Sequence, residues 1–252
     1  MNRCLALCLA ATCLFVNACS RSEGQADVHI AVASNFVAAA NAIEAQFETE
    51  TDYDVELIAG STGALYAQIT QGAPYDVFLA ADQVRPEKLE EVGQAVVGTR
   101  FTYALGKLAI WYPKGGKVTS DSVEPYKVQR FAIANPRLAP YGRAAEDVFS
   151  LMTLQTHMQE RLVLGENVGQ AFAFVKTGNA DAGLVALSQL QTLSAGREDT
   201  YAVLPQEFYR PIRQDAVLLQ HGSEQEAALA FVHFLQSDTA RDIITASGYS
   251  SP

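Results

Sequence analysis

The chain has 252 residues, 49% of them hydrophobic and 18% charged, a balance typical of a globular protein and not of a disordered one. Its formal net charge of −10 argues against a nucleic-acid-binding protein. A chain of this length forms either one large domain or two lobes of about 100 to 130 residues each.

Residues 1–26 are predicted to be an export leader and not part of the fold. The stretch from residue 4 to residue 16 is apolar, but it is too short to cross a bilayer as a helix. Two processing sites stay open: a lipobox, Val16-Asn17-Ala18-Cys19, which leaves a lipid on Cys19, and a signal-peptidase site, Gly24-Gln25-Ala26. All four cysteines lie in the first 19 residues, so we expect neither disulfide nor thiol chemistry in the folded part.

The rest of the chain alternates short apolar strands with helices. Period-2 and apolar runs predict strands at 28–33, 53–58, 76–80, 103–112, 131–134, 161–164 and 182–187. Apolar residues at helical spacing predict helices at about 36–47, 61–71, 86–92, 141–152, 168–175, 223–236 and 238–247, with 201–219 extended. Such alternation predicts parallel sheets flanked by helices, in which ligands bind beyond the carboxyl ends of the strands.

The turn Ala59-Gly60-Ser61-Thr62-Gly63 joins the second predicted strand to the second predicted helix. Ser61 is its candidate N-cap. Free backbone N–H groups at a helix start, together with a hydroxyl, form an anion site that carries no formal charge. Such a site binds anions through local dipoles even in an acidic protein. The alternative interpretation is an ordinary capped turn.

Three further turns have the same character: Ser34-Asn35, Pro140-Tyr141-Gly142 and Asn167-Val168. Each offers a helix start at the carboxyl end of a predicted strand. Two of the four turns lie early in the chain and two lie much later. Two lobes that face each other would therefore bring both pairs into a single cleft.

A set of motifs carries a resemblance to a known family. In order, these are Ala33-Ser34-Asn35, Ala59-Gly60-Ser61-Thr62-Gly63, Asp76-Val77-Phe78-Leu79-Ala80, Ile133-Ala134-Asn135-Pro136, Ala139-Pro140-Tyr141-Gly142, Glu166-Asn167-Val168 and Gly183-Leu184-Val185-Ala186. Together they resemble the periplasmic molybdate-binding proteins of ABC transporters over residues 28–249. The resemblance implies a type 2 periplasmic-binding-protein fold, an α/β protein with two lobes that each hold a mostly parallel sheet.

The resemblance also implies domain boundaries and partners. Lobe I would comprise 27–104 plus 213–252 and lobe II 105–212, with the chain crossing between them near 101–106 and 209–216. The implied function is an extracytoplasmic receptor, a monomer located in the periplasm, that binds molybdate and tungstate and delivers them to an ABC permease in the inner membrane. No cofactor is implied, and the molybdenum is bound through the oxygens of the oxyanion without direct metal ligands.

Carried over by position, the family's binding residues fall on Ser34, Asn35, Ser61, Tyr141 and Val168. The chain departs from many relatives twice, because Ala186 stands where they have tyrosine and Tyr141 where they have a small residue. We hypothesise that the Tyr141 hydroxyl replaces the missing phenol as a donor. The alternative is that its ring covers the pocket while its backbone N–H binds.

The chemistry of the ligand also favours molybdate. Molybdate is a dianion with four acceptor oxygens, so its site should offer donors only, as hydroxyls, amides and backbone N–H groups do. Phosphate is partly protonated near neutral pH and needs an acceptor, which none of the four turns supplies, because Glu166 is expected to point to solvent. Sulfate has the charge and shape of molybdate and stays as the alternative ligand.

An enzyme is the rival class, and the sequence argues against it. Ser61 lies in Ala-Gly-Ser-Thr-Gly and not in the Gly-x-Ser-x-Gly of a serine hydrolase, and no histidine is evidently paired with it. Ferric-ion-binding proteins share the implied fold but use adjacent tyrosines with carboxylates, and the tyrosines here are not clustered in that way. We therefore predict a binding protein without catalytic residues.

Overall fold

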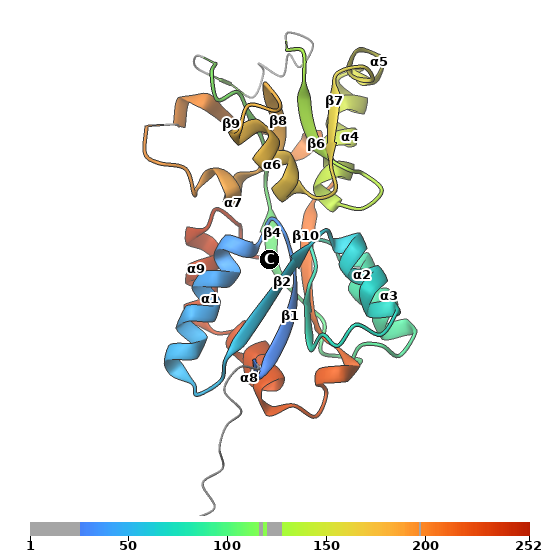
Figure 1. Cartoon of the computed structure of the whole chain (residues 1–252), viewed down its shortest axis with the longest axis vertical. Helices are drawn as coiled ribbons and strands as arrows, with labels where there is room; N and C mark the ends of the chain where they lie inside the picture. Colours follow the sequence, from blue (N-terminus) through green and yellow to red (C-terminus); the bar gives the residue numbers. More distant parts are fainter. Residues whose placement is uncertain (1–25, 116–117, 120–127, 197) are drawn as a thin grey trace, which may run out of the picture.

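A computed structural model describes residues 26–115, 118–119, 128–196 and 198–252, which form two lobes one above the other (Figure 1). Residues 1–25 of the predicted leader lie outside the described residues, and with them the whole lipobox including Cys19 and all of the signal-peptidase site except Ala26. Within the described ranges, no helix is both long and apolar enough to cross a membrane.

The first lobe is built on a five-stranded sheet of order β2-β1-β3-β10-β4. Its strands are β1 (Val28–Ala33), β2 (Val55–Gly60), β3 (Val77–Leu79), β4 (Phe101–Gly106) and β10 (Ile212–Leu218). Its helices are α1 (Val37–Glu50), α2 (Thr62–Thr70), α3 (Val84–Glu91), α8 (Glu226–Phe234) and α9 (Asp238–Ala246). Helices α1 and α9 cover one face and α2 and α3 the other (Figure 1), so the sheet is buried on both sides.

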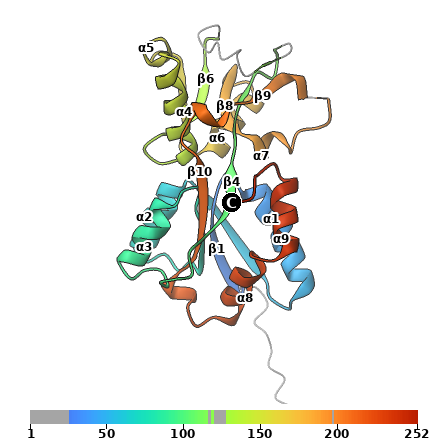
Figure 2. The same ribbon diagram turned by 180° about the vertical axis from the view of Figure 1, so that it is seen from behind.

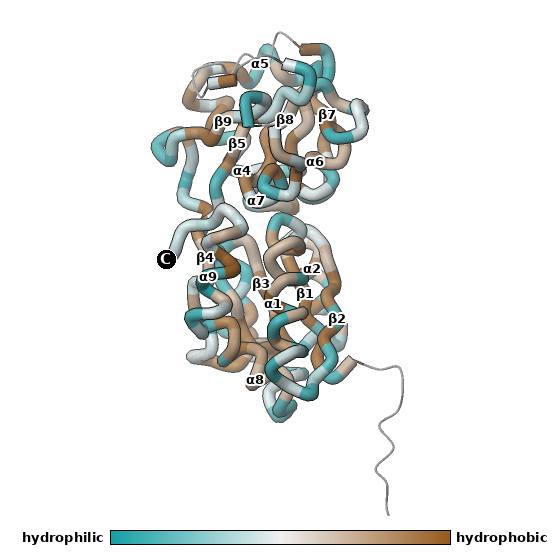
Figure 3. The backbone as a smooth tube through the Cα atoms, turned by 90° about the vertical axis from the view of Figure 1, so that its left-hand side faces the viewer, coloured by the Kyte–Doolittle hydropathy of each residue, from teal (hydrophilic) through white to brown (hydrophobic). Residues whose placement is uncertain are grey.

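The second lobe has a sheet of order β7-β6-β8-β5-β9. Its strands are β5 (Leu108–Trp111), β6 (Phe131–Ala134), β7 (Leu162–Gly165), β8 (Ala182–Ala186) and β9 (Tyr201–Val203). Its helices are α4 (Pro140–Leu151), α5 (Gln155–Met158), α6 (Val168–Lys176) and α7 (Leu187–Leu190). Short 3-10 turns occupy Glu198–Thr200 and Gln206–Phe208 in this lobe, and Gln220–Gly222 after β10 in the first lobe. Apolar segments lie along the central strands of each lobe, with hydrophilic ones mainly at the outer turns (Figure 3).

The two-lobed α/β architecture is confirmed, and in each five-stranded sheet four strands run in one direction while one strand, β10 or β5, runs against them. In the first sheet β1 runs parallel to β2 and β3, whereas β10 is antiparallel to β3 and β4. In the second sheet β6 is parallel to β7 and β8, whereas β5 is antiparallel to β8 and β9. The antiparallel strands are those that follow a passage between the lobes, where no crossover helix sets the direction.

The chain passes between the two sheets at two places. It leaves the first sheet at the end of β4 and enters the second at Leu108, and it returns between β9 and β10. The prediction of one strand over 103–112 was therefore wrong, because the run is divided at Lys107 between strands of different sheets. Strands β4 and β10 lie side by side (Figure 2), with an irregularity in their pairing at Gln214/Asp215.

Candidate functional site

Four strand-to-helix turns meet in a small cavity between the lobes. It is lined by Ala33, Ser34, Asn35, Gly60, Ser61, Thr62, Ala81, Ala139, Pro140, Tyr141, Asn167 and Val168. All five residues predicted to bind the ligand are in this set, and they come from both lobes. The cavity measures about 10 Å³, which is about the minimum needed to hold one water molecule, so the two lobes lie close together around it.

The hydroxyl oxygens of both predicted serines accept hydrogen bonds from backbone N–H groups. Ser61 caps α2 as predicted, with its Oγ accepting from Ala64 N at 3.1 Å. Ser34 Oγ accepts from Gly169 N at 3.2 Å, and this bond joins the two lobes. Because each oxygen already accepts, each hydroxyl proton remains available to donate to an acceptor in the cavity. The two serines are therefore built as donors.

Backbone N–H groups supply further donors, one from each turn. The N–H groups of Asn35, Thr62, Tyr141 and Val168 donate to no backbone or side-chain acceptor within the described residues. Thr62, Tyr141 and Val168 lie in the first turns of α2, α4 and α6, where N–H groups have no partner inside the helix. Such groups carry partial positive charge and favour an anion.

The described lining of the cavity contains no carboxylate and no formally charged side chain. Glu166, which precedes the Asn167 turn, is exposed and does not line the cavity. Nor do the described residues contain a group of three or more His, Cys, Asp or Glu side chains that could hold a metal ion. A cavity that offers donors and no charged acceptor suits an anion whose oxygens only accept.

The side chain of Asn35 is directed elsewhere, contrary to the prediction that its amide binds the ligand. Its Nδ2 donates to Gln214 Oε1 at 2.8 Å and to Tyr249 Oη at 3.0 Å, and the residue is 3% exposed. Its carbonyl oxygen accepts from Tyr249 Oη at 2.7 Å and from Ser188 Oγ at 2.9 Å. The amide therefore fixes the first turn within the first lobe, and the carbonyl oxygen connects the turn to Ser188 of the second lobe. Only the backbone N–H of Asn35 is left for the cavity.

The hydroxyl of Tyr141 likewise points toward the strands that connect the lobes. Among the described residues it makes no well-formed hydrogen bond, and it is buried against Gly106 and the side-chain amide of Gln214, where a Cβ on Gly106 would overlap the phenol oxygen. Burial raises the pKa of this hydroxyl well above its ordinary value, so it stays protonated. The geometry favours the alternative of a ligand bound by the backbone N–H of Tyr141, and it argues against the hydroxyl as a donor.

Tyr141→Phe is therefore expected to change the affinity for the anion by less than about 0.5 kcal/mol, because the ring and the backbone N–H remain. Removing a buried hydroxyl that makes no well-formed hydrogen bond within the described residues should change the stability little. Calorimetric titration together with thermal unfolding measures both quantities. A loss of about 1.5–3 kcal/mol, the value of a hydrogen bond to a charged group, would restore the hydroxyl as a ligand.

Other residues at the site were not predicted from the sequence. Gly63 N donates to Leu138 O at 2.8 Å, a backbone bond between α2 and the other lobe. Asp82 and Arg143 meet beside the cavity, with 2.6 Å between Oδ2 and Nη2. Each contact joins segments that are far apart in the chain, so local sequence patterns could not predict it. The only sequence feature near either contact was the glycine in the Ser61 turn, Gly63. Ala186, which replaces a tyrosine of many relatives, is fully buried at the end of β8 and does not line the cavity.

The chain also resembles known proteins over most of its length. The family model of bacterial extracellular solute-binding proteins matches residues 28–250. The chain belongs to this family.

Named relatives of this solute-binding protein cover almost the whole chain. The molybdate-binding protein ModA of Azotobacter vinelandii is 44% identical over 226 residues, 89% of this chain and 90% of that protein. ModA of Rhodobacter capsulatus is 43% identical over 225 residues, 88% of either chain. The solved structure of the Azotobacter vinelandii periplasmic molybdate-binding protein matches with a TM-score of 0.85 at 38% identity, covering 89% of this chain and 99% of that one.

Proposed function

We propose that this solute-binding protein is an extracytoplasmic receptor that binds molybdate, and tungstate as well, between its two lobes and delivers it to an ABC permease. The observation that carries the proposal is a cavity whose donors are two serine hydroxyls and four backbone N–H groups of the strand-to-helix turns, with no carboxylate in its described lining. The molybdate-binding relatives at 43–44% identity support the choice of ligand over sulfate.

The donor set is strong enough for a receptor. Six hydrogen bonds to a charged ligand, at about 1.5–3 kcal/mol each, amount to about 9–18 kcal/mol before costs. Association and ordering reduce this by at least about 4 kcal/mol. A net value of about 8–12 kcal/mol corresponds to dissociation constants from about micromolar to nanomolar.

The mechanism we propose is closure around the anion. The donors of Ser34, Asn35, Ser61 and Thr62 belong to the first lobe, and those of Tyr141 and Val168 to the second. A dianion that accepts from both sets favours the closed arrangement, because only there do all six donors reach it. The dianion needs no proton acceptor, whereas hydrogen phosphate meets no carboxylate in the described lining that could accept its proton.

We further propose that the protein is a monomer without cofactor or enzymatic activity. Export by a leader over residues 1–26, with lipid on Cys19 or cleavage after Ala26, would place it in the periplasm. The family membership supports an extracytoplasmic receptor. Molybdenum would be held through its oxygens, without a direct protein ligand.

Native mass spectrometry with molybdate, tungstate, sulfate and phosphate tests the proposal. We expect one molybdate or one tungstate per chain. Because ligand binding favours the folded state, molybdate at about 100 times the dissociation constant should stabilise the protein by about 2.7 kcal/mol and raise its melting temperature. Stabilisation by sulfate or phosphate, without any by molybdate, would reject the assignment.

A further inference from the structure

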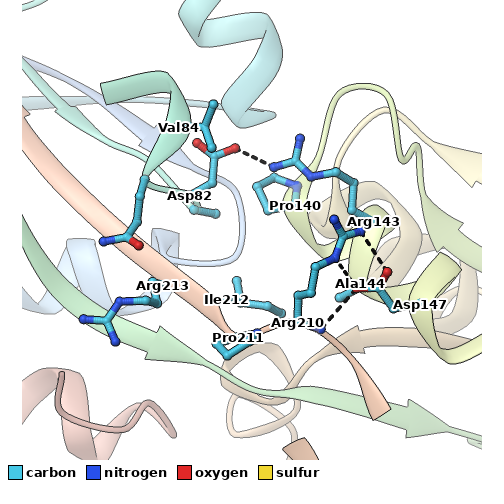
Figure 4. A pocket seen from close by; sticks show the side chains of 12 residues that line it. Asp82, Val84, Pro140, Arg143, Ala144, Asp147, Arg210, Pro211, Ile212 and Arg213 are labelled. Carbon is cyan, nitrogen blue, oxygen red and sulfur yellow. Dashed lines mark hydrogen bonds and ion pairs between the residues drawn. The ribbon is translucent and has the colours of Figure 1, made fainter. Parts of the chain in front are cut away.

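A groove of about 390 Å³ lies beside the anion cavity, on the flank where the lobes meet. It shares Ala81 and Pro140 with the cavity lining. Figure 4 shows Asp82 and Arg143 pointing toward one another across this groove. Asp82 follows β3 in the first lobe, and Arg143 lies in the first turn of α4 in the second.

The carboxylate of Asp82 is the centre of this contact. Its Oδ2 accepts from Arg143 Nη2 at 2.6 Å and from Arg85 Nη1 at 2.5 Å, while its Oδ1 accepts from Arg85 N at 3.1 Å. The Asp82 side chain is 10% exposed and that of Arg143 is 35% exposed. Charge-assisted bonds at such distances are strong. Because the Asp82 carboxylate is largely shielded from water, solvent and salt screen these bonds less than they would at the open surface.

Two different connections meet at this carboxylate. Arg85, three residues after Asp82, holds it from within the first lobe. Arg143 reaches it from the other lobe, and in the same helix Pro140 and Tyr141 line the anion cavity. Separation of the lobes breaks the bond to Arg143 and leaves the bond to Arg85 in place. The Asp82–Arg143 pair is therefore specific to the closed arrangement.

We propose that Asp82 and Arg143 form an interlobe latch, a pair of positioning residues that holds the lobes closed around the bound oxyanion. The proposal rests on the proposed function and deepens it, because it assigns the control of anion release to residues outside the cavity. Two guanidinium groups facing one carboxylate also leave a net positive charge next to a lining that has none of its own. The latch therefore favours retention of a dianion both by geometry and by charge.

The same groove contains a matched control. Arg210 pairs with Asp147 through two bonds, at 2.9 Å from Nε to Oδ2 and at 2.8 Å from Nη2 to Oδ1 (Figure 4). This pair joins α4 to the segment before β10, so it does not connect the lobe of β3 to that of α4. Loss of Arg210 removes an arginine from the same groove and leaves both latch residues in place, although Asp147 also attracts Arg143 electrostatically.

The test measures molybdate binding to the full chain and to Asp82→Asn, Arg143→Gln, the double variant and Arg210→Gln. Calorimetry gives the dissociation constant, and stopped-flow displacement by tungstate gives the dissociation rate. We expect each latch variant to bind about tenfold more weakly, mainly through faster dissociation. The dissociation constant of the double variant should be about the same as that of either single variant, because the two groups act as one pair. Arg143→Lys should restore part of the affinity, and Arg210→Gln should stay within about twofold of wild type.

A second measurement does not depend on the ligand. The N–H groups of Gly63 and Gly169 donate across the lobes, so their hydrogen exchange, followed by NMR, reports closure directly. Without molybdate, both amides should exchange several-fold faster in Arg143→Gln than in wild type. The same amides in Arg210→Gln should exchange at the wild-type rate.

The outcomes separate the latch from the proposed function. If wild type binds no molybdate, the proposed function fails, and the exchange rates alone decide the latch. If wild type binds molybdate but the latch variants match it in affinity and dissociation rate, the latch is wrong. Equal exchange of the two amides in Arg143→Gln and wild type also overturns it.

Discussion

Replacing both Ser34 and Ser61 by alanine is expected to weaken molybdate binding by about 2–6 kcal/mol, which is about thirtyfold or more. Each hydroxyl oxygen accepts from a backbone N–H, so each hydroxyl proton is free for the anion. Each lost donor leaves a charged oxygen unpaired in a site with little water, at a cost of about 1–3 kcal/mol. The effects of neighbouring donors on one ligand need not add, so the single variants are measured as well.

The control for the serine variants is another serine that caps a helix. Ser237 caps α9, and its Oγ accepts from Ala240 N at 3.2 Å, far from the cavity lining. Ser237→Ala removes a cap of the same kind, at a cost of about 1 kcal/mol in stability, and should leave molybdate affinity unchanged. Calorimetric titration of the four serine variants and of wild type checks this. If the double variant Ser34→Ala/Ser61→Ala binds as tightly as Ser237→Ala, the cavity is not the binding site.

Gly63→Ala is expected to reduce molybdate affinity by about 1–3 kcal/mol although it adds only one methyl group. A Cβ at this position would lie 2.7 Å from Leu138 O and 3.1 Å from Leu138 Cα, both of which belong to the backbone of the opposite lobe. Backbone cannot move aside as a flexible side chain does, so the lobes must stay slightly apart. Overpacking of this kind typically costs about 1–3 kcal/mol.

The same substitution should not destabilise the protein without ligand. Gly63 lies inside α2, and alanine is favoured over glycine in a helix by about 1 kcal/mol. We therefore expect an unchanged or higher melting temperature without molybdate, combined with weaker binding. Gly169→Ala serves as a milder comparison, since a Cβ there meets only side-chain atoms, at 3.0 Å from Asn167 Oδ1 and 3.2 Å from Ser34 Cβ. Wild-type affinity in Gly63→Ala would show that closure does not need the close approach at Leu138.

Local patterns predicted most of the elements and the position of the site. The Ser61 cap, the buried positions of the central strands and the meeting of four turns all follow from residues that are neighbours in the chain or repeat at regular spacing. The strand over 103–112 was wrongly continued through Lys107, because both of its halves are apolar and only the topology assigns them to different sheets.

Side-chain directions at the site were harder to predict. Asn35 was expected to face the ligand, but its amide is bound to Gln214, which lies 179 positions later in the chain. The Tyr141 hydroxyl was expected in the cavity, but a packing contact with Gly106 on a connecting strand directs it away. Contacts of this kind depend on how the lobes come together, so the sequence pattern predicted residues that line the cavity but not the directions of their side chains.

Because β10 lies between β3 and β4, the sheet of the N-terminal lobe is completed by residues that are synthesised late. The second sheet uses strands from one continuous stretch, Leu108 to Val203, so all of its strands are present before β10 emerges. Until then β4 has no partner in its sheet and β3 exposes an edge, and unpaired edges readily pair with other chains. The lobe that begins first therefore finishes folding last, and the interval before β10 arrives is the stage at which this chain is most exposed to aggregation.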